Sequence, residues 1–286
     1  MIAASTPGPE ATERAKAVLS PAIAAEIDGQ KLSLPMLPEA AFEALQLMSS
    51  PDPDLRTLSN LVHKDAALAA SLIRAANSPA YYAGRKIVSI QQALVRLGAK
   101  TVGEIVLAAT LDGKNNRVTG FENELRALHE HGVTVAVLSQ ELTRLRRGNA
   151  EEAFLAGLVH DLGRNVLLDA LQKLCNKQRL PVDRAAVRSL ADEHHERVGA
   201  LLGSSWSLPD RVVLAMGSHH HPGKIEGGSD LGHVVALADS LAHRFNEREG
   251  PDLEHPSLTE LHLYAEDVAK LFADRDRLDK RIGAFR

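Results

Sequence analysis

Apolar residues recur at helical spacing along most of the chain, and no segment alternates apolar and polar positions well enough to predict a strand. In the first half, this spacing predicts helices over residues 39–48, 55–63, 66–76, 89–97 and 102–111. In the second half, it predicts helices over residues 122–147, 151–159, 165–174, 183–202, 209–216 and 231–244. The residues from Leu258 onward are predicted to be helical and are strongly charged.

Capping residues support several of these boundaries. Asp65 is a good N-cap for the helix that follows it, and Ser89 caps another. Gly98 is expected to end the helix that begins after Ser89. Near the start of the chain, an amphipathic stretch over residues 13–27 is expected to be interrupted by Pro21, which cannot donate a backbone hydrogen bond.

A polar link over residues 112–120, containing Gly113 and Asn115, divides the chain into two halves. We therefore expect a helical extension over residues 1–30 and a main domain over residues 31–245. The main domain would have an N-terminal lobe at 31–112 and a second lobe at 120–245. A charged helical segment over residues 246–286 would follow, either closing over the second lobe or meeting another chain.

Composition strengthens the helical prediction. The 286 residues include 41 alanines and 42 leucines, the strongest helix formers, while aromatic residues make up only 3%. We therefore predict an all-α fold. A net charge of −4 gives no overall basic field for nucleic acid or an anionic membrane. The single Cys175 excludes an intramolecular disulfide, and Met1–Glu10 lacks a signal-peptide pattern, so we expect a cytoplasmic protein.

Histidine is distributed unevenly, and this is the most informative feature of the sequence. Eight of the 13 histidines fall between His129 and His221. The adjacent pair His160-Asp161 lies at a predicted helix end, where both side chains can turn toward one ion. A carboxylate has two oxygens and can bridge two metals. We therefore consider a metal site in the second half.

Five further residues are candidates for the same site: His131, His195, His219, His220 and Asp239. Each has an ordinary alternative, because a single histidine on a helix is more often a surface residue or a hydrogen-bonded core residue. Asp239 could instead cap a neighbouring helix or pair with Arg244. Imidazole and carboxylate ligands together suit Fe, Mn, Zn, Ni or Co.

The sequence resembles the HDOD family, the HD-related output domains of bacterial signalling proteins, over roughly residues 32–245. The resemblance is carried in the first half by Leu34-Pro35-Met36-Leu37-Pro38, Asp65-Ala66-Ala67-Leu68-Ala69, Arg74-Ala75-Ala76-Asn77-Ser78, Ser89-Ile90-Gln91-Gln92-Ala93 and Leu97-Gly98. In the second half it is carried by Ala156-Gly157-Leu158-Val159-His160-Asp161-Leu162-Gly163-Arg164, His195 with Val198-Gly199-Ala200, Trp206-Ser207-Leu208-Pro209, and His219-His220 before Pro222. The resemblance implies a helical N-terminal lobe packed on an HD-like helical lobe.

The resemblance also implies a ligand set. His131, His160, Asp161 and Asp239 correspond to the first metal of an HD site, with His129 as the neighbouring alternative to His131. The second metal would take His195, His219 and His220, with Asp161 as the bridge. Two ions are implied, with Fe or Mn favoured. Active HD-GYP phosphodiesterases, which are related, carry a lysine where this chain has Arg164, and they carry a Gly-Tyr-Pro motif where this chain has Pro222-Gly223-Lys224-Ile225. Hydrolysis of cyclic di-GMP in the HD-GYP manner is therefore not expected.

The residues considered above are compatible with two functions. The first is a bacterial signal-transduction protein with a retained metal site that acts through contacts with signalling proteins. The second is a metal-dependent phosphohydrolase acting on a nucleotide or another phosphate ester, with Asp161 and Arg164 in the catalytic site. DNA is not expected as a partner, since the only dense basic run, at residues 144–147, lies at a helix end. The sequence leaves a homodimer open.

Overall fold

Helices are the regular structure throughout the described part of the chain. The structure, a computed structural model, describes residues 9–50, 53, 55–112, 118–224 and 230–285. Within these ranges there is no strand, which confirms the predicted all-α fold. Residues 113–117 of the predicted polar link lie outside the described residues. None of the described helices combines the length and the apolar character that crossing a membrane requires.

The N-terminal lobe contains four helices, α2 (Glu39–Ser49), α3 (Leu55–Lys64), α4 (Ala66–Asn77) and α5 (Ile90–Leu111). The predicted caps are confirmed at two of them. The Asp65 carboxylate accepts hydrogen bonds from Ala67 N and Leu68 N at 2.8 and 3.1 Å. The Ser89 hydroxyl accepts one from Gln92 N at 3.3 Å. Gly98 has a left-handed φ of 74°, so α5 is broken there, where the sequence predicts an end.

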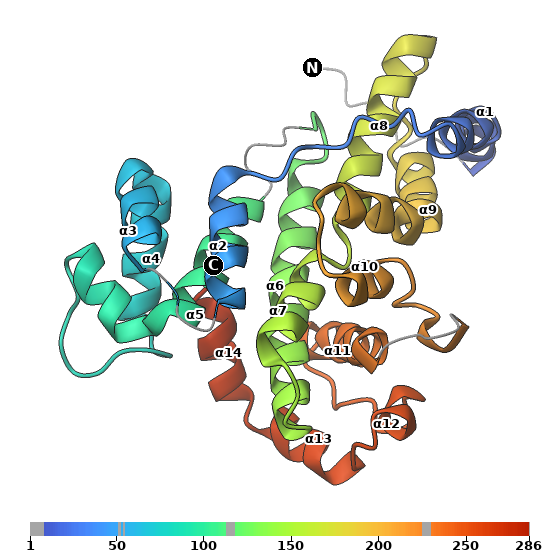
Figure 1. Ribbon diagram of the computed structural model, residues 1–286. Helices are drawn as coiled ribbons and strands as arrows, with labels where there is room; N and C mark the ends of the chain where they lie inside the picture. The colour runs from blue at the N-terminus through green and yellow to red at the C-terminus, as the bar shows by residue number, and fades with distance from the viewer. Residues whose placement is uncertain (1–8, 51–52, 54, 113–117, 225–229, 286) are drawn as a thin grey trace.

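The second lobe contains α6 (Glu122–Leu145), α7 (Ala150–Val159), α8 (Leu162–Gln178), α9 (Arg184–Ser205), α10 (Asp210–Met216), the short 3-10 helix η2 (Pro222–Lys224) and α11 (Asp230–Asn246). In Figure 1, α6 and α7 run side by side through the middle of the molecule, with α3 and α4 on one side and α8 and α9 on the other. Trp206 at the end of α9 ties the lobes together, because its Nε1 donates to the carbonyl oxygen of Pro35 at 2.8 Å.

The first helix, α1 (Pro9–Asp28), differs from the prediction, because it continues through Pro21 without interruption. Leu19, Ile23 and Ile27 lie on one face of it and are fully buried among residues of α8 and α9. Burial of this apolar stripe offsets the hydrogen bond that proline removes. The extension therefore packs on the second lobe, as Figure 1 also shows.

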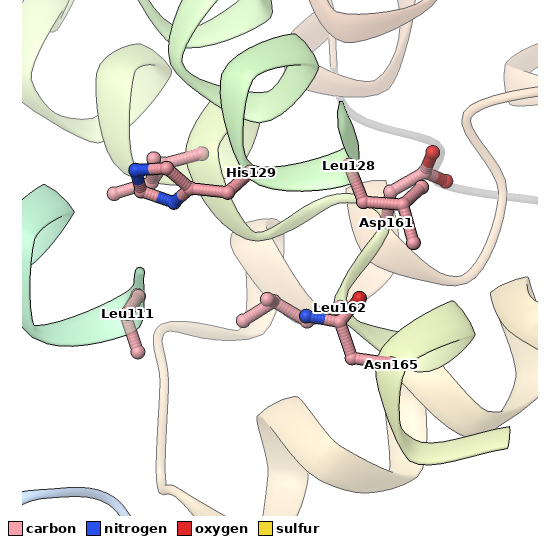
Figure 2. Close-up of a pocket in the computed structure, with 7 residues that line it drawn as sticks. Leu111, Leu128, His129, Asp161, Leu162 and Asn165 are labelled. Atoms are coloured by element: carbon pink, nitrogen blue, oxygen red, sulfur yellow. The ribbon is translucent and has the colours of Figure 1, made fainter. Parts of the chain in front are cut away.

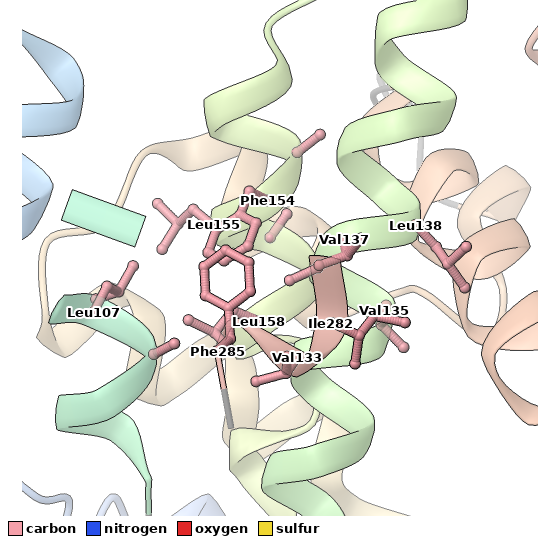
Figure 3. Packing of buried hydrophobic residues seen from close by; sticks show 14 of the residues in the cluster. Leu107, Val133, Val135, Val137, Leu138, Phe154, Leu155, Leu158, Ile282 and Phe285 are labelled. Carbon is pink, nitrogen blue, oxygen red and sulfur yellow. The ribbon is translucent and has the colours of Figure 1, made fainter. Parts of the chain in front are cut away.

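The main hydrophobic core crosses the boundary between the lobes. It joins side chains of α2, α4 and α5 to those of α6, α7 and α11 in one cluster. Figure 3 shows Leu107 of α5 and Phe154 of α7 on facing sides of this core. The two halves that the sequence separates are thus held by shared apolar burial, in which each large side chain contributes roughly 1.5–3 kcal/mol.

The C-terminal segment folds back onto this core. It forms α12 (Ser257–Glu260), α13 (Ala265–Ala273) and α14 (Arg275–Gly283). The ring of Phe285 lies 5.2 Å from the ring of Phe154, and Ile282 is buried beside it (Figure 3). The sequence leaves open whether this segment closes over its own chain, and the structure places it against α6 and α7.

Charged side chains join α14 to α6 beside this apolar contact. The Arg281 guanidinium donates to the carboxylate of Glu141 and to the side-chain oxygen of Gln140. The same Gln140 donates from Nε2 to Glu104 of α5 at 2.5 Å, so a buried polar chain connects α5, α6 and α14. Burial raises the pKa of Glu104, and the hydrogen bond from Gln140 and the charge of Arg281 only partly oppose this.

We expect Arg281→Ala to lower the free energy of unfolding by about 2 kcal/mol. The change leaves the buried Glu141 with fewer partners, although Arg144 and Arg277 remain beside it. Denaturation in urea measures the effect. Lys280→Ala is the control, because Lys280 is exposed on the same helix and should change the value by less than about 0.5 kcal/mol. Equal values for the two variants would contradict the role of Arg281.

We also expect Glu104→Gln to change how stability depends on pH. Because the pKa of Glu104 is higher in the folded than in the unfolded chain, folding favours its protonated form, and this contribution is lost as the pH rises through the folded-state pKa. The variant should therefore gain stability relative to the native chain as the pH rises above the usual glutamate pKa of roughly 4.3. Urea denaturation at several pH values tests this, with the exposed Glu247→Gln as the control. A difference that does not vary with pH would refute it.

Candidate metal centre

The His160-Asp161 pair lies at the junction between two helices. Helix α7 ends at Val159 with His160 as its C-cap, and Asp161 immediately precedes the first residue of α8. Helix α7 is buried along most of its length, so it carries the pair into the interior, where His160 is fully buried and Asp161 is 8% exposed. The local sequence thus places an imidazole and a carboxylate together inside the second lobe.

Helix α9 brings His195 to this junction. A Cβ atom at Gly163 would overlap the carbonyl oxygen of His195 and would lie 2.7 Å from the backbone nitrogen of Gly199. Glycine therefore permits α8 and α9 to approach closely next to Asp161. As a result, His195 Nε2 lies 3.4 Å from Asp161 Oδ1.

The turn after α10 supplies His219 and His220. His219 Nε2 lies 3.6 Å from Asp161 Oδ1 and 3.3 Å from His195 Nε2. His220 Nε2 lies 3.1 Å from His195 Nε2. Glu196 of α9 holds this turn in place, because its carboxylate accepts a hydrogen bond from His220 N at 2.8 Å.

The other end of the cluster is formed by α6 and α11. His131 Nε2 lies 2.8 Å from Asp239 Oδ1, and the rings of His131 and His160 are 5.4 Å apart. Asp239 also lies 3.5 Å from Nε2 of His243, one turn further along α11. Arg244, the partner that the sequence offers as an alternative for Asp239, instead pairs with Glu249.

Two of the histidine rings are oriented by the same type of local hydrogen bond to the backbone. The Nδ1 atoms of His160 and His195 each lie 2.7 Å from the carbonyl oxygen three residues earlier, that of Gly157 and that of Asp192. A carbonyl can only accept, so Nδ1 carries the proton and a neutral ring has its lone pair on Nε2. Such a bond fixes the tautomer and the orientation of a metal-binding histidine.

Burial and neighbouring charges keep four of these groups in ligand-competent forms, whereas burial lowers the pKa of His219 but the hydrogen bond and charge of Asp161 outweigh it and raise that pKa. Burial lowers the pKa of both His160 and His195 to about 4. Burial raises the pKa of Asp161, but His160, His219 and Arg164 outweigh it and hold that pKa well below its usual range. Burial also opposes the ionisation of Asp239, yet the hydrogen bond with His131 keeps the pKa of this carboxyl low. Neutral imidazoles and ionised carboxylates are the forms that bind metals.

Unpaired polar atoms within this cluster test whether its residues fit a metal. His160 Nε2 and Asp161 Oδ1 are buried and have no hydrogen-bond partner among the described residues. Leaving such atoms unpaired is costly, particularly for a carboxylate oxygen. A cation between them would satisfy both atoms. The donor set of imidazoles and carboxylates without thiolates suits a transition metal, so these residues fit the implied ions.

The predicted ligands fall into three overlapping groups, in each of which the donor atoms lie within 4.8 Å of one another. These groups are His131, His160 and Asp239; His160, Asp161 and His219; and His195, His219 and His220. All seven predicted ligands are therefore brought together, with Asp161 in the middle group. That they bind metal remains a prediction.

Arg164 lies beside the cluster, but its guanidinium is already paired. Its Nε lies 3.0 Å from Asp161 Oδ2, and its terminal nitrogen donates to the carboxylate of Asp192 on α9. Arg164 therefore helps to orient Asp161 through the oxygen that also faces His160. Its predicted contact with a phosphate would have to replace one of these carboxylates.

His129, the alternative to His131, faces a different region. Figure 2 shows its ring in a small cavity lined also by Leu111, Leu128, Leu162 and Asn165, with Asp161 at one edge. His129 belongs to none of the three donor groups. The structure therefore favours His131 over His129 as the ligand candidate from α6.

Three residues near the cluster were not identified as site residues from the sequence: Asp192, Glu196 and His243. A helical spacing offers a signal for each, since Asp192 lies three residues before His195, Glu196 follows His195 directly, and His243 lies one turn after Asp239. These spacings are common in helices without any site. These spacings indicate a role at the site only after the structure shows that His195 and Asp239 belong to the cluster.

The helical fold and this cluster define the class: an all-α protein of two packed lobes, with a candidate histidine and aspartate metal centre in the second lobe. The HDOD domain model matches residues 34–222, and the chain belongs to the HDOD family.

Solved structures share the fold. An HDOD domain protein with unknown function from Geobacter sulfurreducens superposes with a TM-score of 0.69 at 21% identity, covering 95% of this chain and 97% of that one. A protein from Shewanella amazonensis SB2B, provisionally named a phosphohydrolase, gives 0.66 at 24% identity, covering 91% and 97%. A protein from Marinobacter aquaeolei VT8, provisionally named a signal transduction protein, gives 0.65 at 23% identity, covering 94% and 66%.

Among curated proteins, an uncharacterized protein of Treponema pallidum (strain Nichols) is 24% identical over 238 residues. The match covers 80% of this chain and 46% of the relative, so the chain spans about half the length of the relative that it matches.

We expect alanine at His131 or His195 to remove at least half of the bound metal, because each replacement deletes one donor from an end group. Elemental analysis of protein purified without chelators or a histidine tag measures the content. The chain supplies matched controls, since His129→Ala and His194→Ala alter neighbouring histidines outside the three groups and should leave the content unchanged. Loss of metal in a control, with retention in its partner variant, would show that the ligand set is wrong.

Proposed function

We propose that this protein is a signal-transduction protein of the bacterial cytoplasm. Its second lobe holds two metal ions in a structural or sensory site, and its output is contact with another protein. The observation that carries this proposal is the state of Arg164, the residue that would have to contact a phosphate in a catalytic site.

The guanidinium of Arg164 is engaged by the carboxylates of Asp161 and Asp192. A bidentate phosphate contact needs free N–H donors directed at the ligand. An arginine already bound by two carboxylates acts here as a positioning residue for Asp161. Membership of the HDOD family, and the provisional name of the Marinobacter protein, also favour a signalling role.

The seven ligand candidates divide between two ions in this proposal. His131, His160 and Asp239 would hold one, and His195, His219 and His220 would hold the other. Asp161 would bridge them, because its Oδ1 faces His195 and His219 while its Oδ2 is 3.6 Å from His160. Iron or manganese is the favoured metal, and Zn, Ni and Co also suit these ligands.

A second candidate function is a metal-dependent phosphohydrolase or phosphodiesterase that acts on a nucleotide or another phosphate ester. The complete set of seven ligands favours it, as does the provisional name of the Shewanella protein. Two bound ions would supply an activated water molecule and would neutralise charge on the phosphate. Arg164 would exchange Asp192 for the phosphate, and Asp161 would keep its bridging position.

We expect metal to stabilise the protein without making it a catalyst. Added Mn²⁺ or Fe²⁺ should raise the melting temperature of the metal-stripped native chain by several degrees, because only the folded state presents the ligands together. Asp161→Ala should abolish this shift, and His194→Ala should retain it. Release of product from a panel of phosphodiesters and nucleotides should be the same for the native chain and Asp161→Ala.

Metal-dependent turnover would reverse this conclusion. If turnover disappears in Asp161→Ala, persists in His194→Ala and falls at least about a hundredfold in Arg164→Ala, the phosphohydrolase is the correct function. Thermal melting of each variant without metal shows whether the variant itself is folded.

A further inference from the structure

A groove on the N-terminal lobe lies apart from the metal centre. It has a volume of about 440 Å³ and is lined by the loop between α4 and α5 and by the first turns of α5. The lining residues are Arg85, Lys86, Ile87, Gln91, Gln92, Val95 and Arg96. In Figure 1 this loop and the start of α5 lie at the edge of the molecule, away from α8 and α9.

The charge of this region is opposite to that of the whole chain. Residues 66–103 carry five Lys or Arg side chains and no Asp or Glu, although the chain has a net charge of −4. Three of the five, Arg85, Lys86 and Arg96, line the groove. None of these three has a carboxylate partner among the described residues, whereas Lys100 further along α5 pairs with Glu151. The groove therefore presents unneutralised positive charge.

The backbone that presents these cations is fixed by side chains beneath it. Asn77 accepts a hydrogen bond from Ile87 N and donates one to Ile87 O, both at 2.8 Å. Arg96 donates to the carbonyl oxygen of Arg85 at 2.8 Å and to that of Ala76 at 3.3 Å. The loop is thus held from both sides, and little conformational entropy remains to be lost when a ligand binds there.

Apolar side chains adjoin the same groove. Val95 is 85% exposed and Val88 is 72% exposed, while Ile87 is buried and forms part of the lining. Tyr82, in the same loop, is 54% exposed. An exposed apolar group that is bordered by polar residues is characteristic of an interaction surface. A small inorganic anion would leave these side chains in water.

From the charge and the apolar surface together, we propose that this groove binds an acidic segment of a partner protein that also carries aliphatic side chains. The carboxylates would pair with Arg85, Lys86 and Arg96, and the aliphatic groups would cover Val88 and Val95. This inference rests on the proposed function in one respect: the proposed output is contact with another protein, and this is why the partner is taken to be a protein.

The test uses the full-length protein and a fluorescein-labelled peptide in which Glu-Glu-Leu-Leu is repeated three times. Fluorescence polarisation measures the affinity at low ionic strength. We expect the double variant Arg85→Glu/Lys86→Glu to weaken binding by at least about tenfold, because it reverses the charges that face the peptide. Val95→Ser should weaken binding as well. A peptide with Gln in place of Glu should bind far more weakly than the probe.

A matched control separates the groove from the overall charge. Arg126→Glu/Lys177→Glu makes the same change in net charge on exposed positions of α6 and α8, and it should alter the affinity by less than about twofold. Equal losses in the two double variants, or no loss in either, would overturn the proposal. Thermal melting verifies that each variant is folded.

Two further outcomes would also overturn it. Tighter binding of a single-stranded oligonucleotide of equal charge, lost in Arg85→Glu/Lys86→Glu, would make the groove a nucleic-acid site. A native dimer that this variant converts to a monomer in sedimentation would make the occupant a second copy of the chain. Metal content is measured on the same variants and should stay at the native value. The peptide affinity therefore tests the groove proposal separately from the proposed metal centre, which the metal content tests.

Discussion

The close approach of α8 and α9 at Gly163 is the constraint on which the candidate metal centre depends. A side chain at this position would collide with the backbone of α9 at His195 and Gly199. Asp161 lies two residues before Gly163, so the distance between the two helices also sets the distance between the carboxylate and the His195 ring. The same two helices hold α1, whose apolar face covers them. One glycine thus links the packing of the second lobe to the geometry of its most polar region.

The structure contains two buried polar systems, and they are stabilised differently. Around Glu141, arginines of α6 and α14 supply the opposite charge, so protein groups satisfy the carboxylate. Around Asp161, one oxygen faces Arg164, while the other faces imidazoles and has no hydrogen-bond partner among the described residues. A buried carboxylate oxygen left in this state costs free energy. The first system therefore joins elements of the fold, and the second is the one in which we propose a cation.

The sequence predicts most of the helices because their signals are local. Apolar spacing, the Asp65 and Ser89 caps and the break at Gly98 each depend on residues a few positions apart. The interruption predicted at Pro21 is wrong, because the burial that keeps α1 continuous comes from α8 and α9, more than a hundred residues away. The return of α14 onto Phe154 is likewise a contact between distant segments. Residue types also indicate the seven ligand candidates, but the roles of Asp192 and Glu196 emerge only when α9 is placed beside Asp161.

Helix α5 is the element that connects the groove to the rest of the molecule. Its first turns line the groove, while Glu104 and Leu107 further along it are buried against α6 and the shared core. The left-handed conformation of Gly98 interrupts the helix between these two parts. A continuous helix would fix the direction of its first turns, whereas the positive φ at Gly98 lets the two parts run in different directions. The groove is therefore anchored to the second lobe through the core, yet its orientation is set locally by Asn77, Arg96 and the backbone at Gly98.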